Sequence, residues 1–382
     1  MASFQKRGKT WQYTISRMVN GKSKPIRKGG FKTKKEAQIA ASEMELELQK
    51  GVTPKLKPIS LYDYFENWYR VFKFDVTNST KTHYVYTLNI IEKYFGHTPI
   101  QQITKEEYQK FLNWFGETHA KETADKINIH IRGAVREAID EGIIRIDFTR
   151  NAKVIGKVPA KKKSEKHLNY HESQLLISEL IENLSNGLGY YLLLLAITTG
   201  LRYGELVGLT HEDFNFDNNT LRINKTWGYS RKMHIGFGPT KNPQSERVIR
   251  VDHVTMNLYQ DLLSRLPKNE YDLIFYSHTS KYKVISNTNA NKLLRKVLLS
   301  LDIKPITVHG LRHTHASLLL YKRNSIYYVS ERLGHADIET TLRDYAHVIK
   351  ELREEDESLM TNAFIEMYNS TSSSDALTTI NN

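Results

Sequence analysis

Residues 309–315 have the sequence His-Gly-Leu-Arg-His-Thr-His. His309 and His313 stand four residues apart, so on a helix they would share one face, a spacing that suits zinc. The chain has no cysteine, no acidic third ligand lies nearby, and Arg312 places a cation in the same turn. An oxyanion such as phosphate fits better, because an arginine and its flanking imidazoles can all donate hydrogen bonds to it. The stretch therefore favours phosphate binding over metal binding.

Two further clusters carry polar groups in an otherwise apolar setting. The first is Thr-Gly-Leu-Arg-Tyr-Gly-Glu-Leu at 199–206, which places Arg202 at a predicted helix amino terminus, where backbone amides favour an anion. By itself, Arg202 is better explained by pairing with Glu205 on the same helix face. The second cluster is Leu-Gly-His at 333–335, followed by Tyr345, one of 22 tyrosines in the chain.

Taken together and in order, these clusters resemble the signature boxes of the tyrosine recombinases, the phage integrase family. The segment 239–247 is similar to the family's β-hairpin and places Lys241 at the position of its catalytic lysine. The strong part of the resemblance covers residues 165–350. It implies a metal-independent and cofactor-independent enzyme that cleaves DNA through a covalent 3′-phosphotyrosine and resolves a Holliday junction. The implied catalytic residues are Arg202, Lys241, His309, Arg312, His335 and the nucleophile Tyr345, with Glu205 in support.

Physical chemistry assigns roles to these residues. Cleavage of a phosphodiester without metal needs cations at the non-bridging oxygens, a nucleophile, and an acid for the leaving oxygen. Arg202 and Arg312 supply planar forks for the phosphate, and Lys241 on a hairpin supplies the acid. His309 is a candidate acceptor for the proton of Tyr345, since a phenol needs activation to become a nucleophile.

Basic residues are distributed unevenly along the chain. The formal net charge is +13, and residues 1–35 hold eleven Lys and Arg residues and no acid, which favours a polyanionic partner. Alternating apolar residues, an Asn20-Gly21 turn and a capping box at 33–36 predict a three-stranded sheet plus one helix over 1–52. By resemblance this is an arm-type DNA-binding domain. The predicted groove contacts are Arg7, Trp11, Tyr13, Arg17 and Lys28.

The rest of the chain is predicted to be mainly helical, which gives a multidomain, mainly α protein with small β-sheets. Helical periodicity predicts a bundle over 58–150, similar to the family's SAM-like core-binding domain, and a mixed α+β catalytic domain follows over 165–350. Residues 351–369 have an apolar stripe at helical spacing, which predicts a helix. The stripe alone would also fit a helix packed on its own domain, but the resemblance implies that it is exchanged between subunits, and we expect that arrangement. The Ser/Thr/Asn-rich tail at 370–382 is expected to be disordered.

Several partners follow from the resemblance: double-stranded DNA with core-type and arm-type sites, a homotetramer on DNA, and two accessory proteins, an excisionase and a host DNA-bending protein. The longest apolar run, 190–197, is too short for a membrane helix, which needs about 20 residues. A cytoplasmic location in a bacterial cell is expected. Two alternatives stay open, a type IB topoisomerase-like activity with the same chemistry, and a non-catalytic architectural DNA-binding protein.

Overall fold

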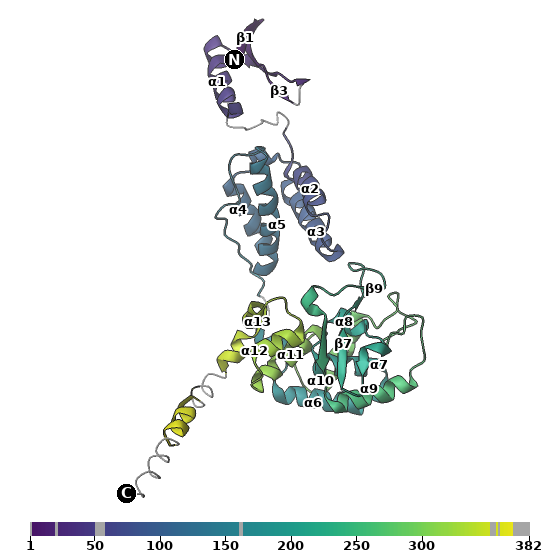
Figure 1. Ribbon diagram of the computed structural model, residues 1–382. Helices are drawn as coiled ribbons and strands as arrows, with labels where there is room; N and C mark the ends of the chain where they lie inside the picture. The colour runs from purple at the N-terminus through teal and green to yellow at the C-terminus, as the bar shows by residue number, and fades with distance from the viewer. Residues whose placement is uncertain are drawn as a thin grey trace, which may run out of the picture. The chain divides into compact units, whose positions relative to one another are not determined.

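The computed structural model describes residues 2–19, 22–49, 58–159, 163–351, 357 and 360–369. The chain divides into two compact units, Met1–Ala160 and Lys161–Asn382. Helices dominate and the sheets are small, so the predicted fold class is confirmed (Figure 1). Within the described residues, no helix is both long and apolar enough to span a membrane.

A small antiparallel sheet and one helix form the amino-terminal part. Its strands lie in the order β1-β2-β5, with a two-stranded ribbon, β3-β4, between β2 and β5 in the chain. Thr33 Oγ1 accepts a hydrogen bond from the Glu36 backbone N–H and so starts the helix at the predicted capping residue. The predicted Asn20-Gly21 turn lies outside the described residues. The elements are β1 (Ala2–Arg7), β2 (Thr10–Ile15), β3 (Met18–Val19), β4 (Lys22–Ser23), β5 (Ile26–Phe31) and α1 (Lys34–Gln49).

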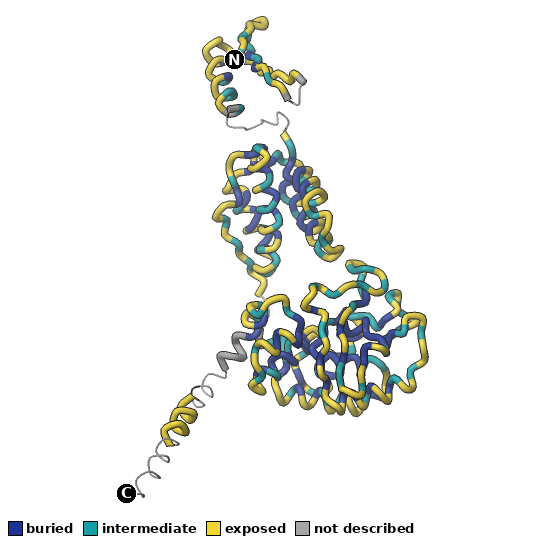
Figure 2. The backbone as a smooth tube through the Cα atoms, in the orientation of Figure 1, coloured by how far each residue is buried: buried dark blue, intermediate teal, exposed yellow. Residues whose placement is uncertain are grey.

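Four helices with an aromatic core follow from residue 61. Side-chain caps fix where they begin: Thr104, for example, forms a full capping box with Glu107. Phe65, Trp68 and Phe111 are among the buried residues of this core, and Figure 2 shows the buried positions turned toward the inside of the bundle. The helices are α2 (Leu61–Phe72), α3 (Asn78–Phe95), α4 (Lys105–Gly116) and α5 (Lys121–Asp140).

The unit from Lys161 onward is a mixed α+β domain. A three-stranded antiparallel sheet in the order β10-β7-β6 and a hairpin, β8-β9, lie among its helices. The helices are α6 (Tyr170–Glu182), α7 (Leu188–Thr199), α8 (Tyr203–Val207), α9 (His253–Arg265), α10 (Asn287–Ser300), α11 (Val308–Tyr321), α12 (Ile326–Leu333) and α13 (Ile338–Glu351). The strands are β6 (Phe214–Asn215), β7 (Thr220–Ile223), β8 (Thr226–Trp227), β9 (Phe237–Gly238) and β10 (Arg247–Arg250).

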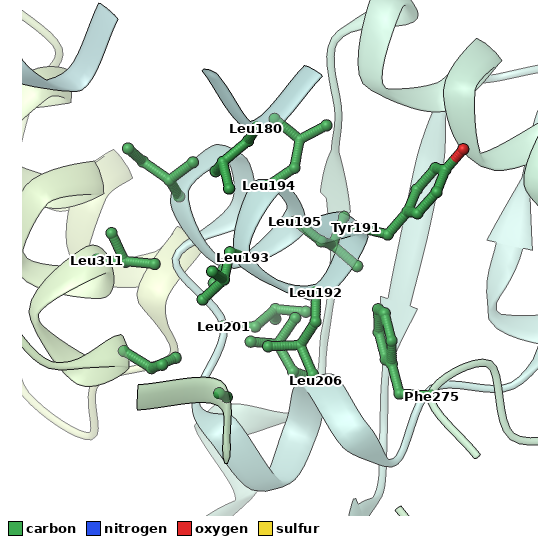
Figure 3. Packing of buried hydrophobic residues seen from close by; sticks show 14 of the residues in the cluster. Leu180, Tyr191, Leu192, Leu193, Leu194, Leu195, Leu201, Leu206, Phe275 and Leu311 are labelled. Carbon is green, nitrogen blue, oxygen red and sulfur yellow. The ribbon is translucent and has the colours of Figure 1, made fainter. Parts of the chain in front are cut away.

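Helix α7 is the centre of this domain. Its residues 191–197 are all buried, and a helix that is apolar all round belongs inside a core. Leu192 and Leu195 pack among side chains from neighbouring helices and from Phe275 (Figure 3). Because α7 is fixed in the core on all sides, its carboxyl end gives the loop at 200–202 a rigid base.

Beyond α13, residues 360–369 are helical and exposed. Met360, Phe364 and Met367 each have more than half of their surface open to solvent. The expected helix at 351–369 is therefore present in the part of it that the structure describes. The expected disordered tail at 370–382 lies outside the described residues.

Candidate active site

Arg202 stands where α7 gives way to α8. Gly200 ends α7 in the left-handed region (φ 69°), a conformation that costs glycine little. The Arg202 guanidinium donates to Glu205 Oε1 at 2.8 Å, to the Gly334 carbonyl at 2.8 Å and to Ser245 Oγ at 3.1 Å. Its side chain remains 22% exposed. Arg202 therefore pairs with Glu205 and still keeps part of its guanidinium open to solvent.

Glu205 is the buried anion beneath this arginine. Its side chain is 1% exposed and also accepts a hydrogen bond from Arg247 Nη2 at 3.0 Å. Burial alone would raise the pKa of this carboxyl, but Arg247, Arg202 and Arg312 together hold the pKa below its usual value. Glu205 is therefore ionised, and it orients two guanidinium groups.

Arg312 lies on α11 and is 3% exposed. It donates to the Gly200 carbonyl at 2.8 Å and to the Leu333 carbonyl at 2.7 Å. Burial and the neighbouring Arg202 lower the pKa of Arg312, while Glu205 opposes them. Arg312 and Arg202 thus bind adjacent carbonyls, those of Leu333 and Gly334, which brings the two cations to one place.

Two histidines approach the same cationic centre. His335 follows Gly334 at the end of α12, and its Nδ1 lies 2.7 Å from Thr341 Oγ1. Burial, then Arg312, Arg202 and Arg247, lower the pKa of His335 to about 3. His309 is exposed to solvent at its surface side, and partial desolvation, then Arg312, Arg202 and Lys241, lower its pKa to about 4. Both imidazoles are therefore neutral at pH 7.

Lys241 is an exposed side chain between β9 and a short turn at Pro243–Ser245. Ser245 anchors that turn, because it is fully buried and receives a hydrogen bond from Arg202. The Lys241 ammonium also lowers the pKa of His309, after partial desolvation, Arg312 and Arg202. It is the most open of the candidate cations.

Tyr345 lies on α13 and is 2% exposed. Its hydroxyl lies 2.9 Å from His313 Nδ1. Burial, opposed by Arg312 and assisted by Asp344, raises the pKa of the phenol above its ordinary value. In this conformation the candidate nucleophile is protonated and covered.

Sequence reasoning missed three residues that the structure brings to this place. Arg247 donates to Glu205, to the Ser245 carbonyl at 2.6 Å and to the Arg332 carbonyl at 2.7 Å. Arg332 is buried and donates from Nε to His315 Nε2 at 2.9 Å. The sequence motif indicates His313 only as one of the imidazoles beside Arg312, not as a partner of Tyr345. Arg247 belongs to the segment 239–247, which resembles the family hairpin. That position is the one feature of the sequence that could have indicated a role for Arg247 in the site.

The amino-terminal sheet corrects one predicted DNA contact. Tyr13 is 1% exposed and its ring stacks on Phe31 at 5.8 Å, so it belongs to the core between sheet and helix and cannot read a groove. Trp11 also lies on the helix side, since Lys34 of α1 stands 5.7 Å above its ring. Side chains along a strand alternate between its two faces, so only every second residue of β2 points away from the core. Trp11 and Tyr13 are two residues apart and share the helix side.

The remaining predicted contacts divide between the two faces. Arg7 is exposed and pairs with Thr10 on the sheet face opposite to α1, and Lys28 is exposed but pairs with Tyr13. Arg17 is half-buried, just after β2. Sequence reasoning did not identify the other polar residues of the outer face, which are Ser3, Gln5, Gln12, Thr14 and Arg27.

Metal-ligating side chains do not gather anywhere among the described residues: no group of three or more His, Asp or Glu could hold an ion there. The polar centre around Arg202 and Arg312 consists of donors and one buried carboxylate, a composition that suits an anion.

Comparisons with known proteins place this geometry in context. The family profile described as "Phage integrase family" matches residues 166–351, that of the "Arm DNA-binding domain" matches 3–48, and that of the "Phage integrase SAM-like domain" matches 60–155. The integrase of Staphylococcus phage L54a is 26% identical over 79% of this chain and 92% of its own length. The ICEBs1 integrase of Bacillus subtilis is 24% identical over 83% of this chain and 86% of its own.

Solved structures share the fold. The Tn1549 transposon integrase in complex with a circular intermediate DNA superposes with a TM-score of 0.66 at 17% identity, covering 79% of this chain and 99% of that one. A lambda integrase dimer bound to a core site gives a TM-score of 0.56 at 18% identity, covering 87% and 91%.

Proposed function

Because the chain belongs to the phage integrase family, we propose that it is a site-specific tyrosine recombinase that integrates and excises a mobile element or phage genome. It breaks and rejoins DNA strands through a covalent 3′-phosphotyrosine at Tyr345, and exchange proceeds through a Holliday junction. The observation that carries the proposal is the meeting of two guanidinium groups, those of Arg202 and Arg312, on the adjacent carbonyls of residues 333 and 334.

In the proposed mechanism, the phosphate binds beside the two guanidinium groups. Arg202 and Arg312 neutralise the non-bridging oxygens, where negative charge grows in the transition state. His309 and His335 are neutral and donate hydrogen bonds to the same oxygens. Glu205 holds the arginines and does not touch the phosphate, in keeping with its burial.

Cleavage then moves one proton to the leaving group. The hydroxyl of Tyr345 gives its proton to a neighbouring imidazole as its oxygen bonds to phosphorus. The bond from phosphorus to the 5′ oxygen breaks, and Lys241 gives that oxygen a proton. Religation runs the same steps in reverse, so the bond energy is kept in the phosphotyrosine and no ATP is needed. The exposed position of Lys241 supports this role, because DNA can reach it without rearrangement of the core.

The arm domain favours a recombinase over a type IB topoisomerase-like enzyme. Relaxation of DNA needs one binding site, whereas the match to an arm DNA-binding domain at 3–48 adds a second. An architectural protein would not need the six candidate catalytic side chains that this chain keeps. We place core-type DNA on residues 58–350 and arm-type DNA on residues 1–52.

The assembly that we propose is a homotetramer on DNA in the bacterial cytoplasm. Lambda integrase was solved as a dimer bound to a core site, and the relatives include the integrase of Staphylococcus phage L54a and the ICEBs1 integrase of Bacillus subtilis. An excisionase and a host DNA-bending protein complete the proposed set of partners. The basic amino-terminal segment supports contact with DNA beyond the core site.

A nicked duplex tests the activity directly. The duplex carries the attachment sequence from DNA that flanks the gene, with the nick placed so that the cleaved end diffuses away. A protein–DNA adduct that survives denaturant is expected from the unaltered chain and not from Tyr345→Phe, which should still bind DNA. Adduct formation should persist in EDTA. No adduct, or an adduct that needs zinc or magnesium, would contradict the proposal.

A further inference from the structure

We infer that His313, and not His309, accepts the proton of Tyr345 when the tyrosine attacks DNA. The inference rests on the proposed function and deepens it by assigning the general base. His313 touches the reacting atom itself, because its Nδ1 lies 2.9 Å from the phenol oxygen, within the reach that a general base needs.

The rings of His313 and Tyr345 are also held in contact. Their centroids lie 5.7 Å apart with a tilted orientation, and both side chains belong to helices, α11 and α13, that pack together. His309 stands one helical turn away, and its ring meets that of His313 edge-on at 5.0 Å. His309 is the exposed member of the pair, open to an incoming phosphate, whereas His313 is half-buried against the Tyr345 hydroxyl. We therefore assign the two histidines to different atoms of the reaction.

The charge state of His313 suits a proton acceptor. Burial is the largest influence on it. The groups facing it are His309 and Arg312 on its own helix, Asp344 on α13, and His167 ahead of α6. All of them except Asp344 lower the pKa of His313, and the net value is about 4. The imidazole is therefore neutral at pH 7 and has a lone pair to offer. A phosphodiester bound at Arg312 brings a negative charge that opposes the effect of that cation and strengthens His313 as a base.

His313 takes up the proton that Tyr345 loses. The O–H bond of Tyr345 breaks and an N–H bond forms at His313 Nδ1 while the phenol oxygen bonds to phosphorus. The imidazolium that results lies beside Asp344, whose carboxylate favours it. On religation the phenolate leaves phosphorus and takes the same proton back. Lys241 serves the 5′ oxygen in both directions, so each proton has its own residue.

His313→Asn is the sharpest variant, because the amide oxygen of Asn falls near the position of Nδ1. It can accept a hydrogen bond from the phenol but cannot hold its proton. On the nicked duplex we expect single-turnover adduct formation to slow by about 100-fold or more, the usual range for loss of a general base, while DNA binding and melting temperature stay close to those of the unaltered chain. His309→Asn is the matched control on the same helix face.

Two further readouts separate a base from a merely structural histidine. Replacing Tyr345 with 3-fluorotyrosine makes the phenol more acidic, so it should restore much of the rate in His313→Asn and little of it in His309→Asn. A 5′-bridging sulfur makes the leaving group independent of an acid, so it should rescue Lys241→Ala and leave His313→Asn slow.

The outcomes distinguish this inference from the proposed function. A rate for His313→Asn within threefold of the unaltered chain, or rescue by fluorotyrosine in His309→Asn instead, would overturn the inference and leave the recombinase assignment standing. Absence of any adduct from the unaltered chain, even with the bridging sulfur, would overturn the proposed function itself.

Discussion

At the scale of single residues, the site consists of cations that are held by main-chain carbonyls and one buried carboxylate. Each guanidinium uses some of its donors to bind protein acceptors before DNA arrives, which limits its rotation. A preorganised donor loses little entropy when it stabilises charge in a transition state. The same arrangement makes stability depend on the charge states of buried groups.

Glu205→Gln tests that dependence. The change leaves Arg247 buried without its counter-charge, and loss of one partner of a buried pair costs about 3–5 kcal/mol. We expect the free energy of unfolding of the catalytic unit, measured in urea, to fall by that order. The matched control is Glu106→Gln, whose partner Lys110 lies 2.7 Å away on an exposed helix face. Water screens this pair, so its loss should change the stability little. Equal losses would contradict the account.

His315 predicts a dependence on pH. Its Nδ1 lies 2.9 Å from the Ile197 carbonyl, and its Nε2 receives the Arg332 donor, so the folded site holds the neutral ring. Burial, then Arg332, lower the pKa of His315 from 6.5 to about 3. Because the unfolded chain binds the proton first, the contribution of this group is complete above pH 6.5. It is lost as the pH falls from 6.5 toward 3.

We therefore expect the melting temperature to drop between pH 7 and pH 5. His315→Gln keeps an acceptor for Arg332 without titrating, so its drop should be smaller, by an amount equivalent to about 2 kcal/mol at most. Calorimetry of both proteins at the two pH values measures the difference. Parallel pH profiles would show that His315 does not contribute.

At the scale of elements, the carboxyl end of α12 joins the parts of the site. Gly334 has a φ of 66° there, and a Cβ at this position would lie 2.9 Å from Arg247 Nη1 and 2.9 Å from Ser245 Cα. Its carbonyl binds Arg202, and the next residue is His335. The helix end therefore aligns the hairpin turn, one arginine and one histidine at once.

Gly334→Ala should disturb all three. The new methyl group must push away the turn at Pro243–Ser245, so we expect adduct formation to fall by about 100-fold, the effect of losing one preorganised donor. Gly8→Ala is the control: Gly8 has a φ of 61°, and a Cβ added there would have nothing within 4 Å, so this variant carries the backbone strain without the clash. Core-site cleavage by Gly8→Ala should match that of the unaltered chain.

At the scale of the whole molecule, the arm domain and the carboxyl-terminal helix are the two parts that the chemistry itself does not need. Deletion of residues 1–52 should leave core-site cleavage intact while integration becomes poor. Binding to arm-type DNA should weaken, and its salt dependence should become shallower by about one unit of slope for each phosphate that the shortened protein no longer neutralises. Filter binding at several salt concentrations measures the slope. An unchanged slope and unchanged arm binding would give this domain another role.

The exposed helix at 360–369 predicts a defect in assembly. Phe364 and Met367 are large apolar side chains on this helix and are 52% and 62% exposed. Replacing both with Ser should preserve the melting temperature of the monomer and binding to one site, and abolish synapsis and recombination. Asn362→Ser on the same helix is the control. A monomer that melts at a much lower temperature would mean that the helix packs on its own domain.

The sequence by itself determined the order of the parts and the identity of most of the site. Periodicity of 3.6 residues and capping residues such as Thr33 and Thr104 act locally, so the helices could be predicted from short windows. The candidate residues Arg202, Arg312 and Tyr345 could be found because their motifs, taken in order, resemble the signature boxes of the family. Only the tertiary structure decided what each side chain faces.

Contacts between distant residues depend on packing that no short window contains. Arg247 joins Glu205 and the Arg332 carbonyl across 42 and 85 positions, and His313 meets Tyr345 across 32. Tyr13 alternates correctly for a strand, but which face of that strand meets α1 was settled by the packing of Ala41 and its neighbours. Local patterns fix the elements, whereas burial free energy, which is a property of the whole core, fixes which side chains reach the site.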